Sequence, residues 1–369
     1  MAVNNLISDG QDMMRICNSC RYCEGFCAVW RAMEYRRDFP AGDLNYLANL
    51  CHDCSECYYA CQYAPPHEWA INAPLTFAKI RGRSYEQYAW PGALASAFRA
   101  NGLVVSLISA LALIVFMFAV VQIKGSSALK TSVSGGNFYQ VASHETLIVI
   151  FGIVGLFSAL AVGIGLLRFC RDIGEQVSDL LKPSVLTTAL KEVLRLEYLD
   201  GGGWGCTYPG DESSQWRRWF HHFTFYGFLL CFAATTLGAI YHYVFGWHAP
   251  HGFTSLPVVL GTLGGLGLLI GPVGLLALKL RRNRDITDES QWGMDTAFLV
   301  LLFLASATGL LLLVLRETTA MGMLMVIHLG IVMALFLTLP YGKFVHGIYR
   351  TTAIVKYALE RKRKQTIGV

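Results

Sequence analysis

Residues 17–27 read CNSCRYCEGFC, and residues 51–61 read CHDCSECYYAC. Both follow the pattern C-x2-C-x2-C-x3-C, and together they hold eight of the eleven cysteines. The spacing is typical of 4Fe–4S ligation, in which a tight run supplies three thiolates and the fourth comes from farther along the chain. In two-cluster domains the fourth cysteine of each run ligates the other cluster. The sequence therefore predicts one cluster on Cys17, Cys20, Cys23 and Cys61, and a second cluster on Cys51, Cys54, Cys57 and Cys27.

Two other uses of these cysteines fit less well. A zinc site prefers two C-x2-C pairs, and each run has one cysteine too many. Disulfides between such close neighbours would be strained, and the basic flanks indicate a reducing compartment. The fourth cysteines precede Ala28 and Gln62 and not proline, which affects the local turn more than the ligation.

The first hundred residues are predicted to form a soluble helical head of the two-cluster ferredoxin type. A short helix should follow the first run, and a second helix, at about residues 44–50, should lead into the second run. We interpret residues 64–90, which are rich in Pro, Gly and aromatic side chains, as a linker. Residues 1–12 are polar and show no signal peptide.

The rest of the chain is predicted to cross a membrane. Hydrophobic residues make up 54% of the sequence and the mean hydropathy is +0.43, which fits a soluble head joined to membrane helices. A crossing needs about 20 apolar residues. Six runs qualify, and the fourth is rich in glycine, so it should pack closely on its neighbours. The runs are 102–123, 146–167, 220–245, 256–278, 297–315 and 321–342.

Lys and Arg set the predicted orientation. Eighteen lie in 168–218, 279–284 and 343–364, whereas three lie in the loops on the other side. Both termini and the head are therefore expected in the cytoplasm. We divide the chain into the head with its linker (1–100), a membrane domain (101–350) with a cytoplasmic loop at 168–218, and a basic tail (351–369). The basic tail is an ordinary anchor at the lipid surface, so we expect no nucleic-acid partner.

Several of the ten histidines lie in or at the ends of the spans, where ionisable side chains are costly and indicate function. At 1.5 Å per residue, His221 and His242 are about 31 Å apart, and His328 and His346 about 27 Å. The spans run in opposite directions. His221 or His222 should therefore meet His346 at the inner level, and His242 should meet His328 at the outer level. We predict one or two haems b, each held between two helices by imidazoles.

Helix phase refines this prediction. His328 and His346 are five turns apart and should share a face, and His221 is better in phase with His242 than His222 is. The alternative is interfacial histidines without a metal, chiefly His222 and His346. Cations at the inner level are candidates to bind haem propionates: Arg217, Arg218, Lys343 and Arg350.

A quinone site has two candidates, the pair His144 and Glu145 at the outer start of the second span, and the stretch 340–343. We interpret the remaining histidines, His52, His67, His248 and His251, as surface residues. In the loop 168–218, Pro183 should open an amphipathic helix at the membrane surface. We interpret the glycine-rich stretch 201–209 as a flexible loop, in which Cys206 is a single thiol without a ligand partner.

Four stretches of the membrane half resemble the tricarballylate-utilisation protein B (CitB) family: 201–209 (GGGWGCTYP), 217–222 (RRWFHH), 226–235 (YGFLLCFAAT) and 339–346 (LPYGKFVH). The resemblance extends over nearly the whole chain. It implies a bacterial inner-membrane electron carrier that reoxidises an FAD-dependent tricarballylate dehydrogenase and passes electrons to the quinone pool. The 18-residue histidine pair also resembles the haem-binding helix of nitrate reductase gamma subunits, which supports haem by analogy.

We therefore predict an electron-transfer, quinone-reducing subunit of an oxidoreductase, with two 4Fe–4S clusters, haem b and a flavoprotein partner. No nucleophile–base pair is evident, so no catalytic residue is assigned, and whether the chain is itself an enzyme stays open. One alternative is the membrane subunit of a heterodisulfide- or sulfite-type reductase that takes electrons from quinol. Another is an iron–sulfur membrane anchor or sensor without haem. The residues leave open the partner's substrate, the quinone type, the number of haems, the direction of electron flow and the oligomeric state.

Overall fold

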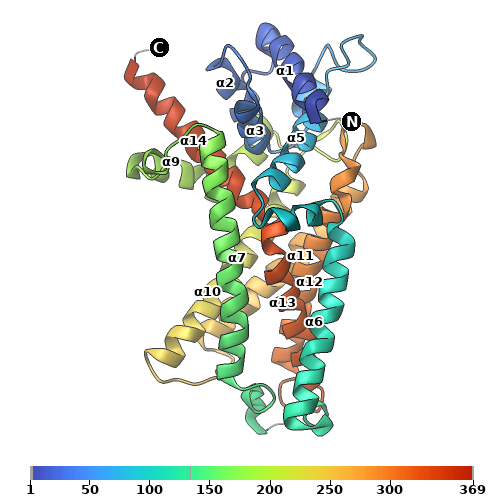
Figure 1. Cartoon of the computed structure of the whole chain (residues 1–369), viewed down its shortest axis with the longest axis vertical. Coiled ribbons are helices and arrows are strands. Elements are labelled where there is room, and N and C mark those ends of the chain that lie inside the picture. The colour runs from blue at the N-terminus through green and yellow to red at the C-terminus, as the bar shows by residue number, and fades with distance from the viewer. Residues whose placement is uncertain (1–2, 131, 133, 368–369) are drawn as a thin grey trace.

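The structure, a computed structural model, describes residues 3–130, 132 and 134–367 and is almost entirely helical. Figure 1 shows a head of short helices at one end and long helices that run from it to the far end. This arrangement confirms the predicted fold class. The head holds α1 (Val3–Cys20), α2 (Ala28–Glu34), α3 (Ala41–Leu50), α4 (Glu56–Tyr59), α5 (Ala73–Tyr88) and the 3-10 helix η1 (Gly92–Phe98).

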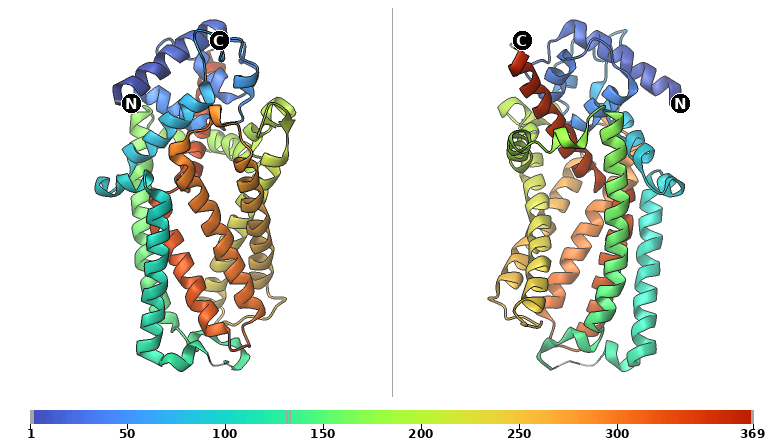
Figure 2. Two further views of the ribbon diagram at one scale, coloured as in Figure 1. Left: turned by 90° about the vertical axis from the view of Figure 1, so that its right-hand side faces the viewer. Right: turned by 60° about the vertical axis from the view of Figure 1, so that its left-hand side comes forward.

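Six described helices are long and apolar enough to cross a membrane, at Gly102–Lys124, His144–Asp172, Trp216–Tyr243, Leu256–Leu280, Glu289–Val314 and Met321–Tyr341. Each overlaps one of the predicted spans, so that prediction is confirmed. The helices concerned are α6 (Asn101–Lys124), α7 (His144–Asp172), α10 (Trp216–Tyr243), α11 (Leu256–Leu280), α12 (Trp292–Val314) and α13 (Met321–Thr338). Both views in Figure 2 show these helices extending from the head to the far end.

Short segments join the spans. At the far end lie η2 (Ser126–Leu129), η3 (Ser134–Gly136) and η4 (Phe138–Gln140). On the head side lie α8 (Val177–Leu180), α9 (Pro183–Leu194), η5 (Glu197–Leu199), η6 (Gly201–Gly203), β1 (Cys206–Thr207), β2 (Ser213–Ser214), η7 (Arg284–Ile286) and η8 (Glu289–Gln291). β1 and β2 form the described sheet, an antiparallel pair.

The segment interpreted as a linker contains a core helix, so that interpretation is wrong. Asn72 caps α5 by accepting a hydrogen bond from the N–H of Leu75 at 3.2 Å, and Pro74 fits the first turn because its missing N–H is not needed there. Phe77, Tyr85 and other side chains of α5 are buried in the core of the head. The aromatic residues that suggested a linker are therefore the residues that hold the helix in place.

The sixth span ends earlier than the sequence suggests. α13 stops at Thr338, the 3-10 turn η9 (Leu339–Tyr341) follows, and α14 (Val345–Ile367) begins a new helix. Pro340 has no N–H to continue the helical ladder. His328 and His346 therefore lie on different helices, and the prediction that they share one face of one helix is wrong.

Glycines allow α11 to lie very close to α10, as predicted. A Cβ added at Gly264 would lie 2.8 Å from the Sγ of Cys231, and one at Gly271 would lie 2.3 Å from the Oγ1 of Thr224. Real Cβ atoms essentially never come so close, so these positions require glycine.

The C-terminal segment belongs to the head and is not a separate tail. Tyr349, Ala353 and Tyr357 of α14 are buried in the same core as the head helices. The basic end of α14 pairs with the loop 168–218, where Arg361 bonds Glu192 and Arg363 lies 3.0 Å from a carboxylate oxygen of Glu175. α14 therefore connects the membrane part to the head.

The loop 168–218 forms a cover beside the second cysteine run. α9 begins at Pro183 as predicted, with Val185 buried and Leu190 exposed. The glycine-rich stretch forms η6 and β1, and it packs so closely that a Cβ at Gly205, whose φ is 101°, would lie 2.4 Å from the carbonyl of Ser214. Cys206 is fully buried in a small core with Cys54. The interpretation of this stretch as a flexible loop is wrong.

Candidate functional site

A first small cavity in the head lies among Cys17, Cys20, Cys23 and Cys61. α1 carries the first two cysteines in its last turns, and Arg21 has a φ of 55° that turns the chain sharply after the helix. Cys61 comes from the second run. The neighbouring Gln62 donates a hydrogen bond through Nε2 to the Sγ of Cys20 at 3.8 Å. The structure therefore brings together the four cysteines predicted for the first cluster.

A second small cavity lies among Cys27, Cys51, Cys54 and Cys57. Its turn is built by Asp53 and Ser55, whose φ angles are 58° and 68°. The backbone N–H of Asp53 donates to the Sγ of Cys51 at 3.4 Å. The structure therefore brings together the second predicted set as well, including the crossed cysteine from the first run.

Each set of four thiols fits a polynuclear cluster better than a single ion. Among residues 3–130, 132 and 134–367, no three His, Cys, Asp or Glu side chains are placed to hold one metal ion. The thiols instead surround a space, as a cluster requires. Burial and the neighbouring thiols raise the pKa of Cys17 to about 12, and those of Cys23 and Cys27 are also raised to about 12, chiefly by burial. Thiols of this kind ionise when they bind a metal.

Arginines clamp the turn at Cys51–Asp53 from several elements. Arg217 donates to the carbonyls of His52 and Asp53 at 2.8 and 2.9 Å, and Arg350 donates to the carbonyl of Cys51 at 2.7 Å. Arg282 binds the Asp53 carboxylate with two hydrogen bonds of 2.7 and 2.8 Å. Burial alone would raise the pKa of Asp53, but Arg282, Arg81 and Arg217 hold it at about 2. The second cavity therefore lies in positively charged surroundings.

Two buried side chains each line two neighbouring cavities, so that three cavities follow one another from the head into the membrane part. Trp30 lines both cysteine cavities, and His52 lines the second cysteine cavity and a cavity of 460 Å³ in the membrane part. His52 is 8% exposed and its Nδ1 donates to the carbonyl of Leu50 at 2.8 Å. Burial and the charge of Arg350 keep the pKa of His52 well below its usual value. The interpretation of His52 as a surface residue is wrong.

The 460 Å³ cavity lies between α10 and α14, at the head end of the spans. His221 and His346 line it, and their ring centroids are 6.1 Å apart. The other walls are mainly apolar, with Phe225, Phe228 and Phe344 among them. His222 lies next to His221 in sequence, but its ring stacks on Tyr226 and is not among the residues that line the cavity.

These residues fit haem with two imidazole ligands. Two metal–nitrogen bonds of roughly 2 Å would put the centroids of two coordinating rings about 6 Å apart. The Nδ1 of His346 donates to the carbonyl of Lys343 at 2.5 Å, which leaves Nε2 as the nitrogen able to bind a metal. The Nδ1 of His221 is buried and has no hydrogen-bond partner among the described residues. Burial and the nearby Arg350 and Lys343 keep the pKa of His346 well below its usual value, so its ring is neutral.

Most of the cations predicted to bind propionates have protein partners instead. Arg218 pairs with Asp200 at 2.7 Å, Lys343 pairs with Asp295 at 2.7 Å, and Arg217 holds the turn after Cys51. Arg350 is the candidate that lines the cavity, and its buried Nε has no hydrogen-bond partner in the described part of the chain. Arg350 is therefore the candidate that fits the role best.

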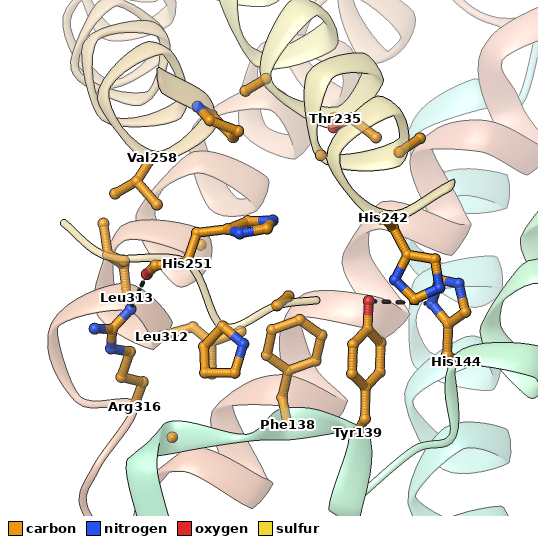
Figure 3. Close-up of a pocket in the computed structure, with 18 of the residues that line it drawn as sticks. Phe138, Tyr139, His144, Thr235, His242, His251, Val258, Leu312, Leu313 and Arg316 are labelled. Atoms are coloured by element: carbon orange, nitrogen blue, oxygen red, sulfur yellow. Dashed lines mark hydrogen bonds between the residues drawn. The ribbon is translucent and has the colours of Figure 1, made fainter. Parts of the chain in front are cut away.

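A cavity of 510 Å³ lies at the far end of the spans. Figure 3 shows His144 and His242 on one side of it, and His251 and Arg316 on the other. The ring nitrogens of His144 lie 3.1 and 3.2 Å from the hydroxyls of Tyr139 and Tyr243. Apolar side chains supply most of the remaining lining. The cavity combines imidazole, phenol and guanidinium groups with a surface suited to an apolar ligand.

The far-end histidines are arranged differently from the prediction. The ring of His242 lies 3.9 Å from that of His144 between centroids, and its Nδ1 is 3.0 Å from the Nδ1 of His248. His328 lies on α13 with its Nδ1 3.0 Å from the Oγ1 of Thr308 and does not line the cavity. The structure does not bring His242 and His328 together, so they do not fit a second haem as they stand.

The residues of the two candidate quinone sites are not equally placed to meet a ligand. His144 lines the far-end cavity, whereas Glu145 is exposed and does not. In the stretch 340–343, Tyr341 donates to the carbonyl of Trp90 at 2.8 Å and Lys343 is paired with Asp295. His248 is exposed as predicted, although its ring contacts that of His242. His251 lines the far-end cavity and contacts the Tyr241 ring, so interpreting it as a plain surface residue is wrong.

Comparison with known proteins identifies the family. A family model described as "Citrate utilization protein B" matches residues 96–367, and one described as "Citrate utilization protein B Fer4-like domain" matches residues 10–87. The chain is 49% identical to "Citrate utilization protein B" of Escherichia coli over 358 residues, which are 97% of this chain and 93% of that protein. The comparison of this chain with solved structures found no match. The resemblance seen in the membrane half is confirmed, and the chain belongs to the citrate utilization protein B (CitB) family.

Proposed function

We propose that this chain carries electrons from a reduced FAD-dependent dehydrogenase, across its head, to a quinone in the membrane. The observation that carries the proposal is the series of cavities with shared walls. Trp30 belongs to both cysteine cavities, and His52 belongs to the second cysteine cavity and to the membrane cavity. One-electron centres in such a series suit the task, because flavin and quinone are both two-electron carriers that here exchange electrons over a distance.

We assign the first 4Fe–4S cluster to Cys17, Cys20, Cys23 and Cys61, the second to Cys51, Cys54, Cys57 and Cys27, and haem b to His221 and His346. These groups would supply the redox chemistry. The chain holds them, excludes water with the apolar side chains around each cavity, and sets their potentials by charge. Positive charge favours the reduced form of a cluster, so the arginines at Asp53 support a higher potential at the second cluster than at the first. That order of reduction potentials favours electron flow from the first cluster toward the membrane.

Six candidate spans and the excess of Lys and Arg on the head side support a location in the bacterial inner membrane, with the head in the cytoplasm. The family name refers to citrate utilization. Together with the resemblance to tricarballylate systems, it supports a partner that oxidises a tricarboxylate.

We place the quinone head group in the far-end cavity, where His144 and Arg316 lie on opposite sides and supply polar groups at the two ends of a mainly apolar lining (Figure 3). Electron transfer over the thickness of a membrane needs an intermediate carrier. Reaching this site from the head-end haem needs a further carrier, since His242 and His328 do not fit a second haem as they stand. If Arg316→Gln leaves quinone reduction unchanged, this placement fails, and the stretch 340–343 becomes the remaining site.

The test uses the purified chain in lipid nanodiscs with a purified FAD-dependent tricarballylate dehydrogenase, its substrate and a short-chain quinone. We expect substrate-dependent reduction of the b-type haem bands followed by quinol formation, and loss of both with Cys61→Ser. Reduction of the bands by quinol alone, without reduction by the flavoprotein, would favour the heterodisulfide- or sulfite-type reductase subunit. Absence of any haem would favour the anchor or sensor.

A further inference from the structure

The first cysteine cavity is the redox site closest to the free surface of the head. Cys20 is partly exposed, and the residues that follow it, Arg21 and Tyr22, are exposed. The second cavity is closed in by Cys54, which is 8% exposed, and by the arginine clamp that faces the membrane part. The clamped side of the second cavity faces the membrane part, so a soluble electron donor has the more direct approach to the first cavity.

The exposed aromatic side chains of the head gather at this cavity. Among the described residues up to 90, Tyr22 and Trp69 are the large hydrophobic side chains that stand exposed, at 64% and 50%. Tyr22 lines the cavity. Trp69 packs on Tyr63, which also lines it, with ring centroids 4.7 Å apart. Leu94 of η1, 44% exposed, is the other large hydrophobic side chain that stands exposed in the described part of the head, and it does not line this cavity. Two such side chains at one cavity are a closer grouping than the single exposed apolar residues that are normal on a protein surface.

Two loops present these rings, 20–25 and 62–70. The first follows α1, and the second lies between α4 and α5, where Figure 1 shows it at the free end of the head, away from the spans. The hydrogen bond from Gln62 to Cys20 ties the two loops together at the cavity. His67 supports Trp69, since its Nδ1 accepts from the N–H of Trp69 at 3.1 Å. The first of these hydrogen bonds joins the loops that carry the rings, and the second lies within the loop of Trp69.

We propose that the patch formed by Tyr22, Tyr63 and Trp69 is the docking surface for the flavoprotein that donates electrons. The inference rests on the proposed function and adds the surface that the partner uses. Exposed Trp and Tyr are the residues that most often dominate the energy of protein interfaces. Charged residues of both signs, Arg21, Glu24 and Glu68, surround the rings and form the polar rim that such interfaces have. A partner bound here lies against the cavity assigned to the first cluster.

The test compares the wild-type chain with the double variant Tyr22→Ser/Trp69→Ser and with Trp204→Ser as the matched control. Trp204 is 82% exposed and lies outside the patch. Haem reduction is followed by stopped flow, once with reduced FAD-dependent tricarballylate dehydrogenase over a range of concentrations and once with dithionite. We expect the double variant to need at least about tenfold more flavoprotein for half-maximal rate, with dithionite reduction and iron content unchanged. The control should behave as wild type.

Each outcome decides the proposal. If the double variant and the wild type are reduced equally by the flavoprotein, the docking surface is wrong and the proposed function stands. If the flavoprotein fails to reduce the wild type, the proposed partner is wrong and the docking proposal fails with it. If the double variant loses iron, Trp69→Ser alone decides, because Trp69 does not line the cavity.

Discussion

The ring centroids of His221 and His346 lie 6.1 Å apart across a cavity between α10 and α14. One turn beyond His346, Arg350 bonds the carbonyl of Cys51 in the second cysteine run. α14 then continues into the core of the head, where Tyr357 is buried. One helix thus positions a candidate haem ligand against the candidate iron–sulfur domain, so the spacing between the two sites is set by a rigid element.

Replacing either of these histidines should remove haem. We expect His221→Ala and His346→Ala each to lose about one haem per chain, because a single remaining imidazole does not hold the group between the two helices. Haem is measured by the pyridine haemochrome assay on purified protein. His222→Ala is the matched control, since its ring stacks on Tyr226 away from the cavity, and it should keep its haem. Loss of haem in that control and not in His221→Ala would reverse the assignment.

The crossed ligand sets predict which cluster each cysteine serves. Cys61→Ser should disturb the cluster on Cys17, Cys20 and Cys23 and leave the other intact, although Cys61 belongs to the second run. Cys57→Ser should do the opposite. Electron paramagnetic resonance of the reduced variants distinguishes the two signals. If Cys61→Ser and Cys57→Ser abolish the same signal, each run ligates its own cluster and the crossed assignment is wrong.

The ion pair of Asp53 should be important for the junction of head and membrane part. Its carboxylate binds Arg282 with two hydrogen bonds, and both side chains are largely buried. Asp53→Asn leaves a buried arginine charge uncompensated, which costs about 3–5 kcal/mol. We expect a clear fall in the temperature at which cluster absorbance is lost in detergent.

Arg15→Gln provides the comparison, because the side chains of Arg15 and its partner Asp12 are 66% and 64% exposed. An exposed pair of this kind contributes about 0–1 kcal/mol. Equal shifts in Asp53→Asn and Arg15→Gln would show that the Asp53 pair does not hold the junction.

Sequence patterns that depend on local spacing predicted the structure well. The cysteine runs, the six apolar runs and the close approach of α11 each depend on one property repeated along a short stretch. The break at Pro340 was missed because the apolar run continues across it, so hydropathy hides a change of helix. α5 was missed because its aromatic content outweighed the capping signal of Asn72 and Pro74.

Contacts between distant segments could not be predicted in this way. The sequence predicts His52 to be a surface residue, but its burial depends on Tyr198 and Arg217, which come from other parts of the chain. The same holds for Arg282, whose partner Asp53 lies in the head. One sequence signal could have pointed to them. Cysteine runs for redox clusters are commonly enclosed by polar groups from elsewhere, so unpaired arginines near span ends were candidates for that role.

The α10–α11 contact predicts a sharp difference between two glycines of one helix. Gly271→Val should destabilise the protein by about 1–3 kcal/mol or more, because any side chain there collides with Thr224 and the carbonyl of Phe220. Gly261→Val should be tolerated, since its Cβ would meet only the Cβ of Ala234, at 3.6 Å. Thermal stability in detergent measures both. Similar stability of the two variants would contradict the close packing.

The most direct test of the account is a dithionite-reduced-minus-oxidised optical spectrum of the purified chain, with haem and iron quantified per chain. The account predicts sharp b-type bands, at least one haem and about eight cluster irons per chain. It also predicts that His346→Ala loses the bands of the head-end haem and keeps the cluster iron. An iron–sulfur spectrum without haem bands in the wild-type protein would contradict the transmembrane relay and leave an iron–sulfur anchor or sensor.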